Sequence, residues 1–453
     1  MELGTRKLLD RSFTGFGFLS IFLMAASLLV ILTPIFVRGF GAFVFQGTVE
    51  FRRMQHVLFE RGDPDELAAE VAAAAEARAP VYRMLAEFDA ELAEMGFLER
   101  REYEGPLQEL RAALHELFGP APGVPEPVMP RDKFGQTRWD RAQVKLHEVL
   151  YRVEYDYSDP TRMGVPVEVP RADDFAGTSL AQLFPYLQAH AEEMLHPRLT
   201  VYLQFLTDES QDAHFFGGIW PEVLGTFYLT LGAMLFALPM GVISAIYLVE
   251  YAGQGRMISF LRTCISTLAG VPSIVFALFG LAFFINTLRV TESKSVLAGS
   301  LTLAVLVLPT VIRASEEALR SVPGTYKEAA LSLGAGKWRA IVSVILPASL
   351  PGILTGVVIS MGRAAGETAP IIFTAAVSVG KAVDVLQLKF WEAFQQPTPA
   401  LPWNIYNLAT EHEAVDEIRH VQFGMVFTLV VLVLVLNATA IAMRARISKK
   451  LKG

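Results

Sequence analysis

The chain has 453 residues, of which 52% are hydrophobic and only 19% are charged. With a positive mean hydropathy of +0.38, it is too apolar for an ordinary soluble protein, so a membrane protein is the default class. The one cysteine, Cys264, rules out an intrachain disulfide. Any part in an oxidising compartment must therefore hold together by packing alone.

Apolar runs without charged residues predict the membrane-spanning segments. About 20 helical residues cross a hydrocarbon core of roughly 30 Å, and each run is long enough, the fourth only just. The runs are residues 12–37, 223–249, 263–288, 295–312, 340–362 with a continuation to about 376, and 421–443. We therefore expect an all-α polytopic membrane protein with six transmembrane helices.

The first run follows Arg6, Lys7 and Arg11, as the apolar region of a signal peptide would. It is about twice the usual length of such a region, and its small residues 25–27 lie in its middle rather than after it. We expect an uncleaved anchor, with residues 1–39 forming the cytoplasmic N-terminus and the first transmembrane helix.

Residues 40–219 separate the first two runs and are expected to form an acidic extracytoplasmic, periplasmic insertion domain. They contain 17 Lys and Arg against 31 Asp and Glu, a net charge of −14, while the remaining chain carries 22 against 15, or +7. An acidic domain is a poor place to bind a free anion, so we expect a docking or bracing role without chemistry. The fold and role of residues 120–218 stay unassigned.

The insertion is predicted to begin with a helical hairpin. Asp63 is expected to cap a helix that has Pro64 at its first position and Glu66 completing a capping box. Two apolar stripes with 3-4-3 spacing follow, at residues 85–95 and 107–117, interrupted by Gly105-Pro106. Two antiparallel helices would bury these stripes against each other.

Lys and Arg in the flanks and loops predict the orientation, because they favour the cytoplasmic side. If the N-terminus is inside, the cytoplasmic segments carry 15 of them and the short outer loops 5. Both termini are therefore predicted to be cytoplasmic, and residues 447–453 form a basic cytoplasmic tail.

Two stretches look like catalytic motifs but lack essential residues. A phosphate loop needs Gly five positions before its Gly-Lys pair and Ser or Thr after it, where this chain has Leu331 and Trp338. Residues 411–416 place Asp416 where a zinc-protease helix has its second His. We expect no enzyme, no bound metal and no cofactor in this chain.

Residues 328–347, EAALSLGAGKWRAIVSVILP, follow a predicted helix start at Pro323-Gly324. The spacing of Glu-Ala-Ala, Gly and Leu-Pro resembles the EAA loop of ABC importer permeases, through which the membrane subunit contacts a separate ATPase. Val344 stands where Ile is commoner. The resemblance implies that ATPase coupling rests on Glu328, Ala329, Ala330 and Gly334.

Residues 268–276, 362–370 and 247–252 resemble the PstA family of phosphate ABC importer permeases, and the likeness covers about residues 217–446. It implies a MetI-like type I importer core of five helices over residues 220–446, with the coupling loop at 323–347. It also implies a PstC-type permease, a homodimeric PstB-type ATPase that binds ATP and Mg, and an extracytoplasmic PstS-type phosphate-binding protein as partners. The location would be the bacterial inner membrane, with no nucleic acid involved.

Arg363 and Glu367 interrupt the fifth apolar run. Charged side chains in a membrane normally face a cavity or one another, and residues four apart share a helix face. The pair either braces the bundle permanently or lines the transport path, where a guanidinium suits the oxygens of phosphate. Glu367 would then hold Arg363 at rest or accept a hydrogen bond from the acidic proton of hydrogenphosphate, a donor that fully ionised sulfate lacks. Thr368 adds a hydroxyl beside the pair.

The sequence therefore favours the permease subunit of an ATP-driven phosphate importer, which forms half of the translocation path by alternating access. One alternative is the same machine serving another oxyanion, sulfate or molybdate. A second is a membrane-anchored extracytoplasmic sensor, although no kinase, cyclase or DNA-binding module accompanies it.

Overall fold

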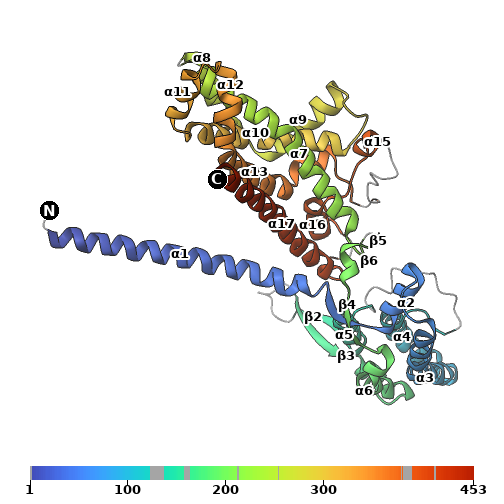
Figure 1. The fold of residues 1–453 in the computed structure, drawn as a ribbon. Helices are drawn as coiled ribbons and strands as arrows, with labels where there is room; N and C mark the ends of the chain where they lie inside the picture. The colour runs from blue at the N-terminus through green and yellow to red at the C-terminus, as the bar shows by residue number, and fades with distance from the viewer. Residues whose placement is uncertain are drawn as a thin grey trace. The chain divides into compact units, whose positions relative to one another are not determined.

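The computed structural model describes residues 3–122, 137–157, 164–211, 214–253, 255–378, 380, 390–412 and 415–452 (Figure 1). The chain divides into two compact units. The membrane unit consists of Met1–Phe40 with Gln204–Gly453, and the polar unit is Gly41–Leu203. The polar unit is shorter than the insertion predicted at 40–219, because residues from Gln204 onward belong to the membrane unit, where His214 Nε2 lies 2.8 Å from Glu222 Oε1.

The membrane unit is mainly helical. Its α-helices are α1 (Leu3–Phe40), α7 (Trp220–Ile246), α8 (Arg256–Leu268), α9 (Ser273–Gly280), α10 (Val296–Arg320), α11 (Gly324–Ser332), α12 (Lys337–Ala340), α13 (Leu346–Gly366), α14 (Ala369–Thr374), α15 (Phe390–Phe394), α16 (Leu401–Thr410) and α17 (Arg419–Lys452). Three π-helical segments are η5 (Tyr247–Tyr251), η6 (Leu281–Thr287) and η7 (Ile341–Ile345); a 3-10 turn, η4 (Leu203–Leu206), and the short strands β5 (Ser210–Gln211) and β6 (Phe216–Gly217) precede α7.

Five helical stretches of the described chain are long and apolar enough to cross a membrane, and a bent pair makes a sixth if it counts as one span. This agrees with the predicted six. The third predicted run is the bent pair, Arg256–Leu268 and Ser273–Thr287, which meet at 100°. Pro272 precedes α9 and cannot donate a backbone hydrogen bond, so the helix restarts there in a new direction.

The fifth predicted run is also not one continuous helix. α13 ends at Gly366, Glu367 is extended with φ −79° and ψ 123°, and α14 begins at Ala369. Pro370 explains the break, because it has no N–H for the Gly366 carbonyl but is readily accepted in a first helical turn.

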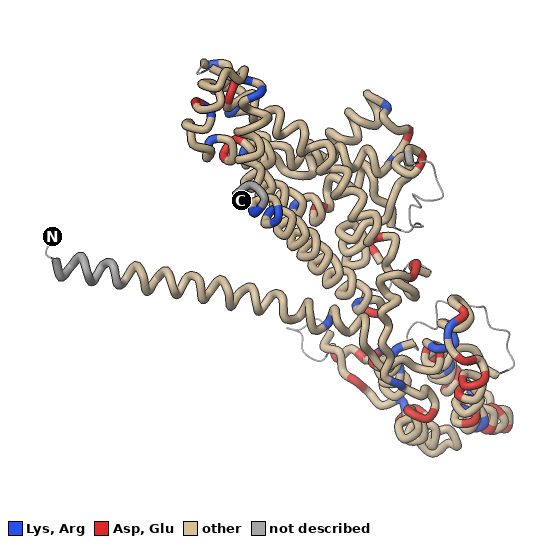
Figure 2. The backbone as a smooth tube through the Cα atoms, in the orientation of Figure 1, with Lys and Arg blue, Asp and Glu red and all other residues tan. Residues whose placement is uncertain are grey.

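The core of the membrane unit lies where α7, α10 and α13 pack together. Gly356 of α13 lies so close to α10 that a Cβ there would be 2.3 Å from the Cβ of Ala314, and Gly232 of α7 is similarly close to Ser300. Small residues at such contacts let membrane helices approach closely. Figure 2 shows few charged residues along the middle of these helices.

The polar unit contains α2 (Val49–Phe59), α3 (Pro64–Glu94), α4 (Phe97–Phe118), α5 (Trp139–Leu150) and α6 (Leu183–Leu195), with 3-10 turns η2 (Arg171–Phe175) and η3 (Ser179–Gln182). Two antiparallel strand pairs accompany them. β1 (Val44–Gly47) pairs with β4 (Arg198–Val201), opposing Val44 to Val201, and β2 (Tyr151–Asp156) pairs with β3 (Val165–Pro170), opposing Tyr151 to Pro170.

The predicted hairpin is formed by α3 and α4, and both stripes enter the core of the polar unit, where Phe88, Leu110 and Leu117 are fully buried. The break lies at Met95-Gly96, however, and not at Gly105-Pro106, which is inside α4. Gly96 makes the better turn because its N–H is accepted by the Glu99 carboxylate, 3.4 Å away, at the start of α4.

Asp63 caps α3 as predicted, since its Oδ1 accepts from the N–H groups of Asp65 at 2.9 Å and Glu66 at 3.5 Å. The Glu66 carboxylate does not return to the cap but lies 2.8 Å from Arg198 Nη1. The helix start therefore contributes to holding β4 beside α3.

Candidate functional site

Arg363 and Glu367 form an ion pair at the point where α13 ends. Arg363 Nε donates to Glu367 Oε1 at 3.2 Å, and the side chains are 36% and 19% exposed. The pair forms although the helix has already ended, because the extended backbone of Glu367 still directs its carboxylate to the guanidinium. Nη1 and Nη2 of Arg363 make no hydrogen bond with any residue that the structure describes, so the outer fork of the guanidinium is open to a ligand.

Thr368 connects this break to α16. Its Oγ1 donates to Pro402 O at 3.4 Å, a long and weak hydrogen bond. Glu367, Pro402 and Thr226 of α7 line an internal cavity of about 10 Å³. Such a volume is near the minimum for one water molecule and cannot hold phosphate. An anion would therefore approach Arg363 from its exposed side.

Two polar residues near the pair were not singled out by the sequence analysis. Asn437 of α17 lies against Gly362, and its buried Oδ1 has no hydrogen-bond partner among the described residues. Ser360 of α13 is fully buried, and its hydroxyl is likewise unpaired within the described part of the chain. A lone Asn in the last apolar run was the available signal, but its position beside Gly362 depends on packing between distant helices.

A second buried polar group joins the start of α7 to α16. Glu222, His214 and Asn404 are 1%, 4% and 0% exposed. Glu222 Oε1 lies 2.8 Å from His214 Nε2 and accepts from Asn404 Nδ2 at 3.0 Å. Because a buried carboxylate without partners is costly, this network fixes α16 against α7.

The predicted coupling residues lie on and just after α11. Glu328 and Ala329 are exposed, whereas Ala330 is buried. Gly334 has φ +83°, a conformation that suits glycine, and lets the chain turn into α12. Beside it, Leu333 is 89% exposed and Trp338 is 63% exposed. Apolar side chains gathered on a protruding turn are typical of a protein-binding surface.

The turn is attached to the helices behind it. Ile341 and Ile345 of η7 are buried against Ala245 and Ile246 of α7 and Leu319 of α10. Lys327 of α11 pairs with Glu250 of η5 at 2.5 Å. The turn is therefore packed directly against α7 and α10.

Comparison with known proteins identifies the family. The family model described as "Binding-protein-dependent transport system inner membrane component" matches residues 237–453. The probable ABC transporter permease protein YqgI of Bacillus subtilis is 32% identical over 280 residues, which cover 60% of this chain and 91% of that protein. This chain belongs to that permease family.

Other relatives of the permease carry more specific names. The phosphate transport system permease protein PstA 1 of Mycobacterium tuberculosis is 38% identical, covering 51% of this chain and 71% of that protein. The corresponding PstA of Yersinia pestis is 35% identical, covering 49% and 71%. A structure of the MetNI methionine ABC transporter, 19% identical, covers 51% of this permease and 94% of that chain with a TM-score of 0.37.

Family membership makes the chain a multi-pass inner-membrane protein and the permease component of a transporter. Permeases of ABC importers work in general with an ATPase and a binding protein. In the described residues of the permease, no group of three or more His, Cys, Asp or Glu is placed to hold a metal ion.

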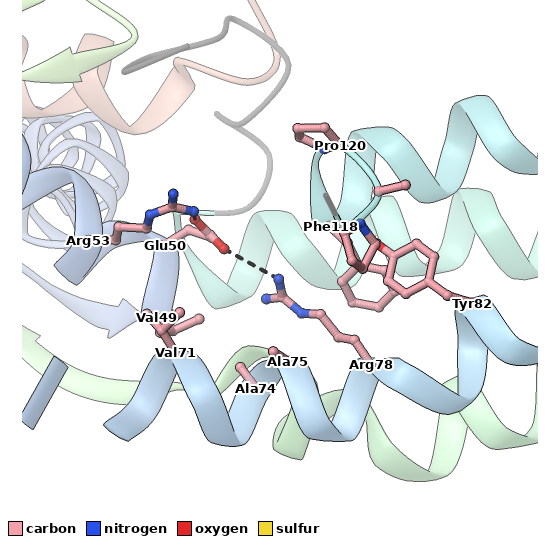
Figure 3. A pocket seen from close by; sticks show the side chains of 12 residues that line it. Val49, Glu50, Arg53, Val71, Ala74, Ala75, Arg78, Tyr82, Phe118 and Pro120 are labelled. Atoms are coloured by element: carbon pink, nitrogen blue, oxygen red, sulfur yellow. Dashed lines mark hydrogen bonds and ion pairs between the residues drawn. The ribbon is translucent and has the colours of Figure 1, made fainter. Parts of the chain in front are cut away.

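The polar unit of the permease has a pocket of about 420 Å³ between α2, α3 and the end of α4 (Figure 3). Arg78 extends across it, with Nη1 3.3 Å from Glu50 Oε1, its Nε donating to Met194 O and its guanidinium over the ring of Phe118. Arg53 lies on the other side of Glu50, 3.7 Å away. The Glu50 carboxylate is paired with both arginines, so the positive charges in this pocket are partly neutralised by its own side chains.

Proposed function

We propose that this permease is the membrane-spanning subunit of an ATP-driven inorganic phosphate importer, and that it forms half of the translocation path by alternating access. The observation that carries the proposal is the Arg363 and Glu367 pair at the break between α13 and α14, with an open guanidinium fork. Relatives named phosphate transport system permease proteins, at 38% and 35% identity, support the choice of substrate.

The Arg363 guanidinium pairs with Glu367 at rest and also with phosphate during transport. At rest Glu367 neutralises Arg363, which lowers the cost of holding the cation within the membrane. Phosphate then takes the outer guanidinium nitrogens in a bidentate contact. The Glu367 carboxylate accepts a hydrogen bond from the P–OH group of hydrogenphosphate, a donor that fully ionised sulfate lacks. This gives a physical basis for preferring phosphate over sulfate or molybdate.

The partner subunits would contact the permease at the two ends of the translocation path and along its side. The turn formed by α11 and α12 would seat in a PstB-type ATPase dimer, which hydrolyses ATP with Mg, so that this chain needs no cofactor. A PstC-type permease would supply the other half of the path, and a PstS-type binding protein would deliver phosphate outside. Exposed Glu328, Leu333 and Trp338 support the ATPase contact. Both termini would be cytoplasmic and the polar unit periplasmic.

The first prediction tests the assigned cation. In the transporter reconstituted with its partners, Arg363→Ala is expected to reduce phosphate uptake and phosphate-dependent ATP hydrolysis at least about tenfold, because a charge-assisted bidentate contact is lost. Arg446→Ala at the end of α17, an exposed residue outside the path, serves as the matched control and should behave as the wild type. Retained coupling in Arg363→Ala would remove Arg363 from the site.

A further inference from the structure

A second basic site lies at the end of the membrane unit that carries α11. The π-helical segment η5, the start of α8 and the end of α10 line an open cavity of about 640 Å³. Three arginines line it, Arg256, Arg262 and Arg320, together with described residues such as Leu248, Ala252 and Gly255. No acidic side chain is among the described lining residues, which sets it apart from the pocket of the polar unit.

The positive charge in this cavity exceeds what the surrounding residues neutralise. Glu316 of α10 lies 4.0 Å from Arg262 and 3.5 Å from Arg320, and it must serve both. Arg256 makes no hydrogen bond or ion pair with any described residue. Three guanidinium groups therefore face one carboxylate, which leaves a net charge of about +2 for an anion to neutralise.

The contacts of Arg262 also indicate an excess of positive charge in this cavity. Its Nη2 donates to Leu248 O at 2.9 Å, which fixes the guanidinium, while its Nε is buried and has no hydrogen-bond partner in the described part of the chain. The other acid close by, Glu250, is already engaged with Lys327 at 2.5 Å. Arg262 Nε faces the shared carboxylate of Glu316 at 4.0 Å, so neither Glu316 nor Glu250 fully neutralises the arginines that line the cavity.

The helix that contributes two of these arginines also exposes apolar side chains. None of the residues of α8 is buried, and Met257 and Phe260 are 70% and 62% exposed. α8 meets the helical stretch that begins with α9 at a bend of 100°. A basic amphipathic helix of this kind lies in the interface of a membrane, with its apolar side in the acyl region and its charges among the headgroups.

The location of α8 indicates the leaflet. Arg320 ends α10 four residues before α11 begins, so the cavity and the turn formed by α11 and α12 share one end of the membrane unit. Figure 1 shows α8, α11 and α12 together at this end. If the proposed function holds, this end faces the cytoplasm, where the leaflet is rich in anionic lipids. A phospholipid has a phosphate that can neutralise the arginines and acyl chains that can cover the apolar side chains of Met257 and Phe260. An acidic side chain of a protein would neutralise the arginines but would not cover the apolar side chains.

We propose that this cavity binds the headgroup phosphate of an anionic phospholipid, with the acyl chains lying along the exposed side of α8. The lipid completes the charge balance of Arg256 and Arg262 and holds α8 in the interface next to the coupling turn. Transported phosphate is not its ligand.

Native mass spectrometry of the assembled transporter, titrated with phosphatidylglycerol and in parallel with phosphatidylcholine, tests the proposal. Phosphatidylglycerol should bind saturably and more tightly. Its affinity should fall about fivefold in Arg256→Gln, because one basic residue near an anionic headgroup is lost. Arg256 has no described partner, so this variant keeps the fold, and the double variant with Arg262→Gln should weaken binding further. Arg446→Gln is the matched control and should bind as the wild type.

Four results would overturn the proposal, and the first three concern the ligand. Those three are equal binding of the two lipids, unchanged affinity in Arg256→Gln, and displacement of the lipid by millimolar inorganic phosphate, which would assign the cavity to a free anion. Binding to the isolated chain but not to the assembled transporter would also overturn it, by showing that a partner subunit covers α8. Since none of these measurements requires transport, their failure is distinguishable from failure of the phosphate assay.

Discussion

The ion pair of Arg363 and Glu367 lies where α13 ends. In the function proposed for it, the carboxylate that stabilises the cation at rest also accepts a hydrogen bond from a protonated anion. The sequence spacing of four predicted that the two side chains meet, and they do at 3.2 Å. It did not predict Asn437 beside Gly362, because the two residues come from helices far apart in the chain.

The role of Glu367 gives the second prediction. In Glu367→Gln, the side chain keeps its size but no longer attracts a proton donor, and it can donate to sulfate. Sulfate is expected to compete with phosphate uptake more strongly than in the wild type, by about tenfold in inhibition constant, as expected for the loss of one charge-assisted hydrogen bond. Competition assays with labelled phosphate measure this. Unchanged selectivity together with normal uptake would contradict the role assigned to Glu367.

At the scale of helices, uniform apolar composition was sufficient to locate the spans but not their interruptions. Pro272 and Pro370 were visible in the sequence, yet whether a proline bends a helix or ends it depends on what packs beside it. The hairpin break shows the same limit, since Gly96 and not Gly105 ends the first helix. The pairing of β1 with β4 could not be predicted, because it joins segments about 150 residues apart.

The close approach of α13 to α10 gives the third prediction. Gly356→Ala would place a methyl group 2.3 Å from the Cβ of Ala314, so the two helices must separate. The expected cost is about 1–3 kcal/mol of unfolding free energy, as for other overpacked contacts. Denaturant unfolding in detergent measures it. Gly15→Ala in α1, where a Cβ meets nothing within 4 Å, should change nothing, and an equal loss in both variants would refute the packing explanation.

The polar unit carries most of the acidic residues of the chain, and several of them form ion pairs with arginines. Glu70 receives hydrogen bonds from Arg52 at 2.6 Å and Arg198 at 2.9 Å, which tie α3 to α2 and β4. Burial raises the pKa of Glu70, but the hydrogen bonds and charges of the two arginines together outweigh it, so that the pKa lies below its usual value of 4.5.

This shift gives the fourth prediction, for the full-length protein. Because the unfolded state binds more protons when the folded pKa is lowered, the stabilisation from Glu70 is fully present above about pH 4.5 and is lost as the pH falls through the folded pKa. Glu70→Gln should remove that part of the acid sensitivity and weaken the β1 and β4 pairing by about 1 kcal/mol. Hydrogen exchange of the β1 and β4 amides, compared with wild type at each pH, measures both effects.

Glu66→Gln is the matched control for this comparison. Its carboxylate meets the same Arg198, but the pair is well exposed, so its removal should change amide protection little. If the two variants lose protection equally, the exposed charges and not the buried contact with Arg52 hold β4 in place.

On the scale of the whole molecule, the polar unit starts and finishes at the same place. β1 and β4 are paired, and Tyr202 N donates to Phe43 O at 2.7 Å, so the chain leaves the unit beside the point where it entered. A segment with adjacent ends can be gained or lost in a single genetic event without changing the spacing of the sequences on either side. The permease helices and residues 41–203 are therefore free to evolve at different rates, and relatives with a shorter or unrelated segment at this position are compatible with the same transport machinery.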